Sequence, residues 1–162
     1  MKLPPLVKLL DKYLPSLTIP DTEGNPYLTR YFLFGKERKY FNVFIHHFHA
    51  SDKDRSENGT LLLHNHPWRF SLSFILSGGY SEERRQPDDT ITRKKYPAGS
   101  FNYINDHHFH RVDLLEKDGW SIFMTGWRRG GDASWGFWDR QSKTYTGFLQ
   151  ALKKLGKDVI IP

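Results

Sequence analysis

Apolar and polar residues alternate through most of the chain, in short runs separated by glycine, proline, asparagine and aspartate. In the clearest run, residues 70–77, large apolar side chains alternate with serines: Phe70, Leu72, Phe74 and Leu76 against Ser71, Ser73 and Ser77. Such alternation, bounded by turn residues, predicts β-strands. The expected strands are 28–34, 41–49, 60–64, 70–77, 80–84, 90–95, 100–104, 108–114, 121–127 and 136–138.

Helical spacing of apolar residues occurs only near the two ends of the chain. Residues 3–14 form one expected helix, and residues 146–155, with Thr146 as the cap and Gly156 as the stop, form the second. Residues 15–26 and 51–58 are expected to be loops. Because no helix-length crossover separates the strands, antiparallel pairing is expected. The pattern predicts an all-β sandwich or barrel, as one domain over 1–162 with its barrel at about 27–138.

Composition narrows the possible chemistry. The chain of 162 residues has no cysteine, which excludes disulfides, thiolate metal sites and cysteine nucleophiles. Any metal must therefore be held by nitrogen or oxygen. No apolar run approaches the ~20 residues of a membrane span. Prolines occupy positions 4 and 5, where a signal peptide would be apolar, so a cytoplasmic protein without membrane contact is expected. The net charge of +6 comes from scattered residues, and no nucleic-acid-binding motif is present, so nucleic acid is not an expected partner.

Eight histidines fall into three clusters, and each cluster contains a pair at i, i+2 spacing. On a strand this spacing places both side chains on one face. Two imidazoles on one face, joined by a third from a distant strand, make a nitrogen site for a divalent metal. The clusters are His46, His47 and His49; His64 and His66; and His107, His108 and His110.

We predict that His64, His66 and His110 are the metal ligands. The first two precede an alternating strand and a glycine turn, and the third lies on a later strand whose Val112 needs burial on the same face. His107 and His108 compete with His110 for the third place. For the first cluster, two interpretations stay open: a second polar cluster near Asp52, or surface residues of an edge strand.

The arrangement resembles the cupin family. The first cupin motif runs Gly-x5-His-x-His-x3–4-Glu-x6-Gly, and the matching positions here are Gly59, His64, His66, Ser71 in place of the glutamate, and Gly78. The first interval is one residue short. The second motif is matched by Pro97-Ala98-Gly99 followed by His110. The resemblance implies a jelly-roll β-barrel, and the missing glutamate implies a three-histidine site.

Part of the chain is similar to the cysteine dioxygenase group of three-histidine cupins. The similarity covers 103–106 and 110–112, and it places Arg30 roughly where that family binds the substrate carboxylate. Arg30 is therefore either a substrate anchor or part of a surface salt bridge. Tyr103 is either a hydrogen-bond donor in the pocket or a core tyrosine, and the core position is favoured. The family's serine–histidine–tyrosine relay is replaced by Phe123, Thr125 and Trp127, which disfavours cysteine as the substrate.

A broader resemblance, over residues 27–138, is to small bacterial and phage-encoded cupins of uncertain function. The leading hypothesis is a mononuclear non-haem iron dioxygenase that acts on a small, anionic substrate. Fe(II) is the favoured metal, with Zn, Ni or Mn as alternatives. Two rival functions remain: a metal-dependent isomerase or lyase for a small sugar or keto acid, and a non-enzymatic binding module. A homodimer is a further expectation.

Three other side chains have two interpretations each. Glu82 is either a fourth ligand or base, or an exposed turn carboxylate, and the second is favoured. Trp68 and Trp127 either line a pocket or pack in the barrel, and packing is favoured.

Overall fold

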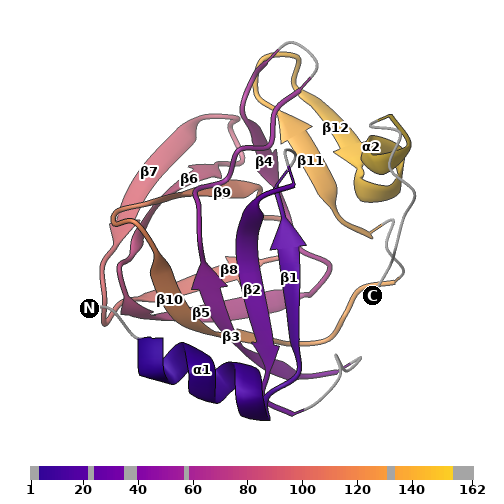
Figure 1. Cartoon of the computed structure of the whole chain (residues 1–162). Helices are drawn as coiled ribbons and strands as arrows, with labels where there is room; N and C mark the ends of the chain where they lie inside the picture. Colours follow the sequence, from indigo (N-terminus) through magenta and orange to yellow (C-terminus); the bar gives the residue numbers. More distant parts are fainter. Residues whose placement is uncertain (1–3, 22–23, 35–39, 57–58, 131–133, 155–162) are drawn as a thin grey trace.

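In the computed structural model, two antiparallel sheets face each other and short helices flank them (Figure 1). The structure describes residues 4–21, 24–34, 40–56, 59–130 and 134–154. The elements in chain order are α1 (Pro4–Tyr13), β1 (Ser16–Pro20), β2 (Pro26–Phe32), β3 (Asn42–Phe48), β4 (Leu62–His64), β5 (Phe70–Ser77), β6 (Tyr80–Arg85), β7 (Ile91–Tyr96), β8 (Phe101–Asn105), β9 (His110–Leu114), β10 (Gly119–Thr125), β11 (Gly136–Asp139), β12 (Thr144–Gly147) and α2 (Phe148–Lys154).

Each sheet has six strands, in the orders β1-β2-β3-β10-β5-β8 and β12-β11-β4-β9-β6-β7. The chain crosses repeatedly from one sheet to the other, and every strand pair in the two sheets is antiparallel. This is a jelly roll, as the family resemblance implies, and it agrees with the sandwich or barrel that the strand pattern predicts. Strands β1 and β12 lie outside the expected set, and residues 16–20 were expected to be loop. Both are edge strands, and an edge strand tolerates the prolines that made β1 resemble a loop.

The two helices begin and end close to their expected positions. Helix α1 covers the outer face of the first sheet, where Leu10 packs with Tyr31 and Trp120 (Figure 1). Helix α2 contacts β11 and β12. Its expected last residue, position 155, and the expected stop at Gly156 lie outside the described residues.

Strand β5 alternates as predicted, and its serine face is the one that turns inward. Ser71 and Ser73 are buried, whereas Leu76 is exposed. These small inward side chains leave room for large ones, because Phe123, the cross-strand partner of Ser73 on β10, packs with Trp68 in the buried core.

A glycine turn carries the chain from β5 in the first sheet to β6 in the second. Gly78 and Gly79 both have positive φ, and a Cβ on Gly78 would lie 2.2 Å from the carbonyl oxygen of Asp118. Only glycine fits this turn without strain. The turn sets β6 beside β9, and this pairing brings Glu82 close to His110.

Candidate metal centre

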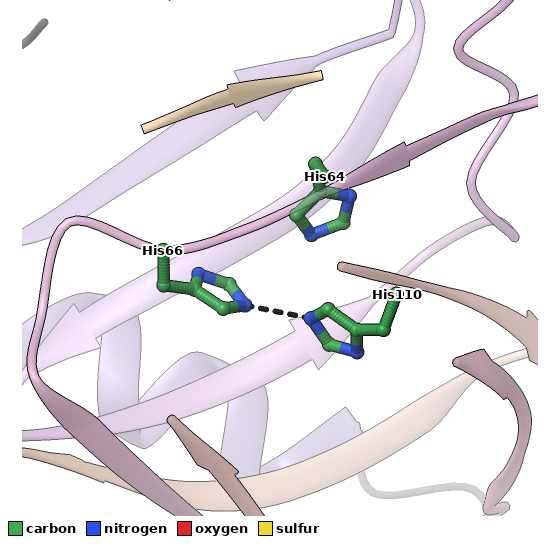
Figure 2. Close-up of side chains that lie close together, drawn as sticks. All are labelled: His64, His66 and His110. Atoms are coloured by element: carbon green, nitrogen blue, oxygen red, sulfur yellow. Dashed lines mark hydrogen bonds between the residues drawn. The ribbon is translucent and has the colours of Figure 1, made fainter. Parts of the chain in front are cut away.

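Three histidines from two distant stretches of chain converge between the sheets (Figure 2). His64, the last residue of β4, is paired directly with His110, the first residue of β9. His66 follows two residues later, so an extended chain returns its side chain to the same side. Cross-strand pairing and i, i+2 spacing therefore act together to bring the imidazoles into one place.

The geometry of the three rings suits one metal ion. A nitrogen from each ring lies within 4.8 Å of the nitrogens of the other two. The Nε2 atoms of His66 and His110 are 2.8 Å apart, and the dashed line in Figure 2 marks this contact. Two imidazole nitrogens bound to one ion at about 2.1 Å are separated by roughly 3.0–3.4 Å. The three side chains could therefore hold a divalent metal with small adjustments.

Burial favours the neutral imidazoles that a metal requires. It lowers the pKa of His64 to about 4, although the nearby Asp52 carboxylate acts in the opposite direction. Burial also lowers the pKa of His66 well below its usual value, and the other histidines and Arg30 lower it further. The side chain of His64 keeps 17% of its surface exposed, which leaves that side of the site open to solvent.

A buried carboxylate, Glu82, lies behind His110, although the sequence favoured an exposed position for it. Glu82 was expected to be an exposed turn residue, but it is only 2% exposed, and its Oε1 is 2.7 Å from His110 Nδ1. Arg84 and Asn102 donate further hydrogen bonds to Glu82. Burial by itself would raise the pKa of Glu82, yet hydrogen bonds and electrostatic attraction from His110 and Arg84 lower it to about 2. Because Glu82 contacts the far side of the ring, it does not share the ligand position.

A second buried carboxylate lies near His64. Asp52 Oδ2 is 3.8 Å from His64 Nδ1 and accepts a hydrogen bond of 2.7 Å from the backbone amide of Val112. The hydroxyl of Tyr27 donates a hydrogen bond to the other oxygen of Asp52. These contacts anchor the start of the 51–58 segment onto β9, where the sequence predicted a polar loop.

Arg30 lies inside the barrel beside His46 and close enough to His66 to lower the pKa of that ring. Its guanidinium carbon is 4.6 Å from the ring centre of Phe44 and 5.5 Å from that of Trp68, and its Nε donates to His46 Nε2 at 3.2 Å. Trp68 also stacks near His66, with ring centres 5.9 Å apart. An arginine enclosed by aromatic rings near a group that could hold a metal can bind an anion.

Tyr103, the other expected catalytic residue, lies on the outer face of β8. It is 54% exposed, whereas its neighbours Asn102 and Ile104 are buried. Both the pocket position and the favoured core position are wrong, because strand alternation turns Asn102 and Ile104 inward and leaves Tyr103 exposed. Trp127 is likewise 55% exposed and does not line the barrel.

The remaining histidines do not join the group. His107 is exposed, and His108 Nδ1 accepts a hydrogen bond from the amide of Asn105. In the first cluster, His46 is buried inside the barrel, whereas His47 lies on the outer face and stacks on Trp120 with ring centres 3.9 Å apart. Strand β3 is an interior strand, so the edge-strand interpretation of this cluster is wrong.

The sequence matches no family model and no curated protein. Its fold is similar to solved structures at low sequence identity. Fe(II)-HppE with the alternative substrate (S)-1-HPP has a TM-score of 0.53 at 12% identity, over 70% of this chain and 56% of that chain. Hydroxypropylphosphonic acid epoxidase from S. wedmorenis has a TM-score of 0.50 at 12% identity, with the same coverage. A mutant of Bacillus subtilis oxalate decarboxylase OxdC has a TM-score of 0.50 at 15% identity, over 66% of this chain and 28% of that chain.

These likenesses establish the fold. This protein has a cupin jelly roll with short flanking helices. The chain spans little more than half the length of the epoxidase and under a third of the decarboxylase. The HppE structure holds Fe(II), and the oxalate decarboxylase has Mn(II) centres. Among the described residues, neither helix has the length and apolar character that crossing a membrane requires.

Proposed function

We propose that this protein is a mononuclear non-haem iron dioxygenase that acts on a small anionic substrate. The observation that carries the proposal is a convergent set of three imidazoles, His64, His66 and His110, with Ser71 at the position of the cupin glutamate. Three neutral ligands leave the full charge of a divalent ion on the site, together with open coordination positions. Bound Fe(II) would supply redox chemistry with dioxygen.

The charges around the site favour an anionic substrate. Glu82 is paired with Arg84, so its charge is compensated within the protein. Arg30 adds a positive charge on the side of His66 that faces His46 and the aromatic rings. A carboxylate or a similar anion bound there would be attracted by both the metal and the guanidinium.

Buried polar atoms inside the barrel support hydrogen bonding to the substrate. His46 Nε2 accepts from Arg30, and burial, followed by the charge of Arg30, keeps the pKa of His46 well below its usual value. The neutral ring therefore carries its proton on Nδ1, which is buried and has no protein partner. Ser121, its cross-strand neighbour, also has a buried hydroxyl without a protein partner. Both groups can donate to an acceptor on the substrate.

The likeness of 103–106 and 110–112 to cysteine dioxygenase supports iron and dioxygen as reactants. The substrate is expected to differ from cysteine, because Phe123, Thr125 and Trp127 replace the relay of that family. Small thiols other than cysteine, diketones and phenolic acids are the substrate classes to test.

Metal analysis followed by oxygen uptake tests the proposal. The metal-free protein is reconstituted anaerobically with Fe(II), Mn(II), Ni(II) or Zn(II), and uptake is followed with each substrate class. We expect uptake that depends on both Fe(II) and substrate. Arg30→Gln should raise KM for an anionic substrate more than it lowers kcat, whereas the exposed Arg93→Gln should leave both unchanged. Turnover without oxygen would indicate the isomerase or lyase alternative, and a bound metal without turnover would indicate a binding module.

A further inference from the structure

The contacts of Glu82 suggest a role that a packing residue would not need. Its side chain is almost fully buried between β6, β8 and β9, where an ionised carboxylate loses favourable hydration. Four described contacts compensate for that loss: His110 Nδ1 and Asn102 Nδ2 on Oε1, and the Arg84 guanidinium on both oxygens. Asn102 is itself held by Tyr80 and Arg84. The carboxylate is therefore fixed in position.

This carboxylate determines which nitrogen of His110 can bind a metal. An ionised carboxylate only accepts hydrogen bonds, so the 2.7 Å contact requires a proton on His110 Nδ1. In the neutral ring the lone pair then resides on Nε2, which is the atom 2.8 Å from His66 Nε2. The same hydrogen bond restricts rotation of the ring and increases the basicity of the ligating nitrogen.

The other two histidines are supported differently. Asp52 lies 3.8 Å from His64 Nδ1, beyond hydrogen-bond distance, and its oxygens are already used by Tyr27 and the amide of Val112. His66 packs against the rings of Trp68 and Phe123. Of the three, His110 thus has the closest carboxylate contact.

We infer that Glu82 is a positioning residue that fixes His110 as an Nε2 ligand of the metal proposed above. The inference rests on the proposed three-histidine site, but it does not depend on whether the reaction is an oxygenation. It gives the buried carboxylate a specific role, which is to orient one ligand before the metal binds.

Metal titration of the whole protein tests this role. Glu82→Gln and Glu82→Ala should weaken binding of Co(II) about 10–100-fold and change the visible absorption spectrum of bound Co(II). Glu83→Gln, on the outward-facing neighbour of the same strand, should change neither. In a His110→Ala background, Glu82→Gln should cause no further loss, because its effect passes through His110.

Urea unfolding of the metal-free variants separates positioning from folding. If Glu82→Gln does not fold, Glu82→Asp keeps the charge but withdraws the oxygen from Nδ1, and it should still weaken Co(II) binding. A folded Glu82 variant with wild-type affinity and spectrum, or an equal loss in the His110→Ala background, would overturn the inference and leave the three-histidine site standing. If the wild-type protein binds no Co(II), both the inference and the proposed metal site are wrong.

Discussion

Two stretches of this chain carry histidines at the same spacing but have different surroundings. In the first, His47 lies on the outer face of the interior strand β3 and meets Trp120, and His49, directly after the end of that strand, meets Thr29. In the second, His64 and His66 face the barrel interior and meet His110. Spacing puts two imidazoles on one face in both cases. Of the two stretches, only the second faces the barrel interior and has a third histidine, His110, paired across the strands. Only this stretch therefore contributes to a possible metal site.

The difference also shows in the charged groups behind the rings. His110 has a buried carboxylate at hydrogen-bond distance, and His64 has one nearby. His47 lies 3.4 Å from Asp118, whose side chain is half exposed, so water screens that pair. A buried carboxylate next to an imidazole costs desolvation free energy that hydrogen bonds and ion pairs must offset, whereas an exposed one is an ordinary surface contact.

The largest expected effect is a loss of metal affinity when a histidine of the second stretch, but not of the first, is replaced. We expect a loss of Co(II) or Zn(II) affinity in each of the variants His64→Ala, His66→Ala and His110→Ala. This loss should exceed the roughly 100-fold decrease that removal of a supporting residue can cause. His47→Ala and His49→Ala should leave the affinity unchanged.

The same variants can be compared by unfolding. Metal at 100 times its Kd should stabilise the wild-type protein by about 2.7 kcal/mol and the ligand variants much less. Equal metal-induced stabilisation in His64→Ala and His47→Ala would contradict the distinction between the stretches.

A smaller effect should distinguish the buried His46 from its outward neighbours. Because the pKa of His46 in the fold is well below its usual value, the unfolded chain binds a proton near pH 6.5 that the folded chain does not. Stability from this residue is therefore present above pH 6.5 and is lost as the pH falls below it, by up to about 1.4 kcal/mol per pH unit.

His46→Gln, which keeps an acceptor for Arg30 but cannot titrate, should remove this part of the slope. Urea unfolding of the metal-free proteins between pH 5 and 7 measures the slope of unfolding free energy against pH. The contributions of the other histidines to this slope are the same in both proteins and cancel in the difference. Parallel pH profiles for wild type and variant would show that His46 does not resist protonation.

The smallest effect concerns the outer face. His47→Ala removes a ring stacked on Trp120, and such aromatic pairs contribute about 0.5–1.5 kcal/mol. We expect a decrease in unfolding free energy in that range, with no change in metal binding. A loss of several kcal/mol would mean that the outer histidines have a structural role that these contacts do not reveal.

Much of the fold follows from local pattern. Alternation in 70–77 and the glycines at 78 and 79 are enough to predict a strand and the turn that ends it, because both depend on residues close in sequence. The burial of Glu82 was not predictable in this way. Its neighbours in sequence are polar, and the groups that bury it come from β8 and β9. Tyr103 was misplaced for a related reason: the inward face of a short strand depends on the sheet it joins.

The amino-acid sequence alone determined that any metal must be held by nitrogen or oxygen and that two histidines share one face at 64 and 66, since both statements need only residue identity and the geometry of an extended chain. Tertiary structure decided which third histidine completes the group, where Arg30 lies, and that Glu82 supports His110. These are contacts between strands far apart in the chain, and their distances are set by sheet pairing and by the folding of one sheet over the other.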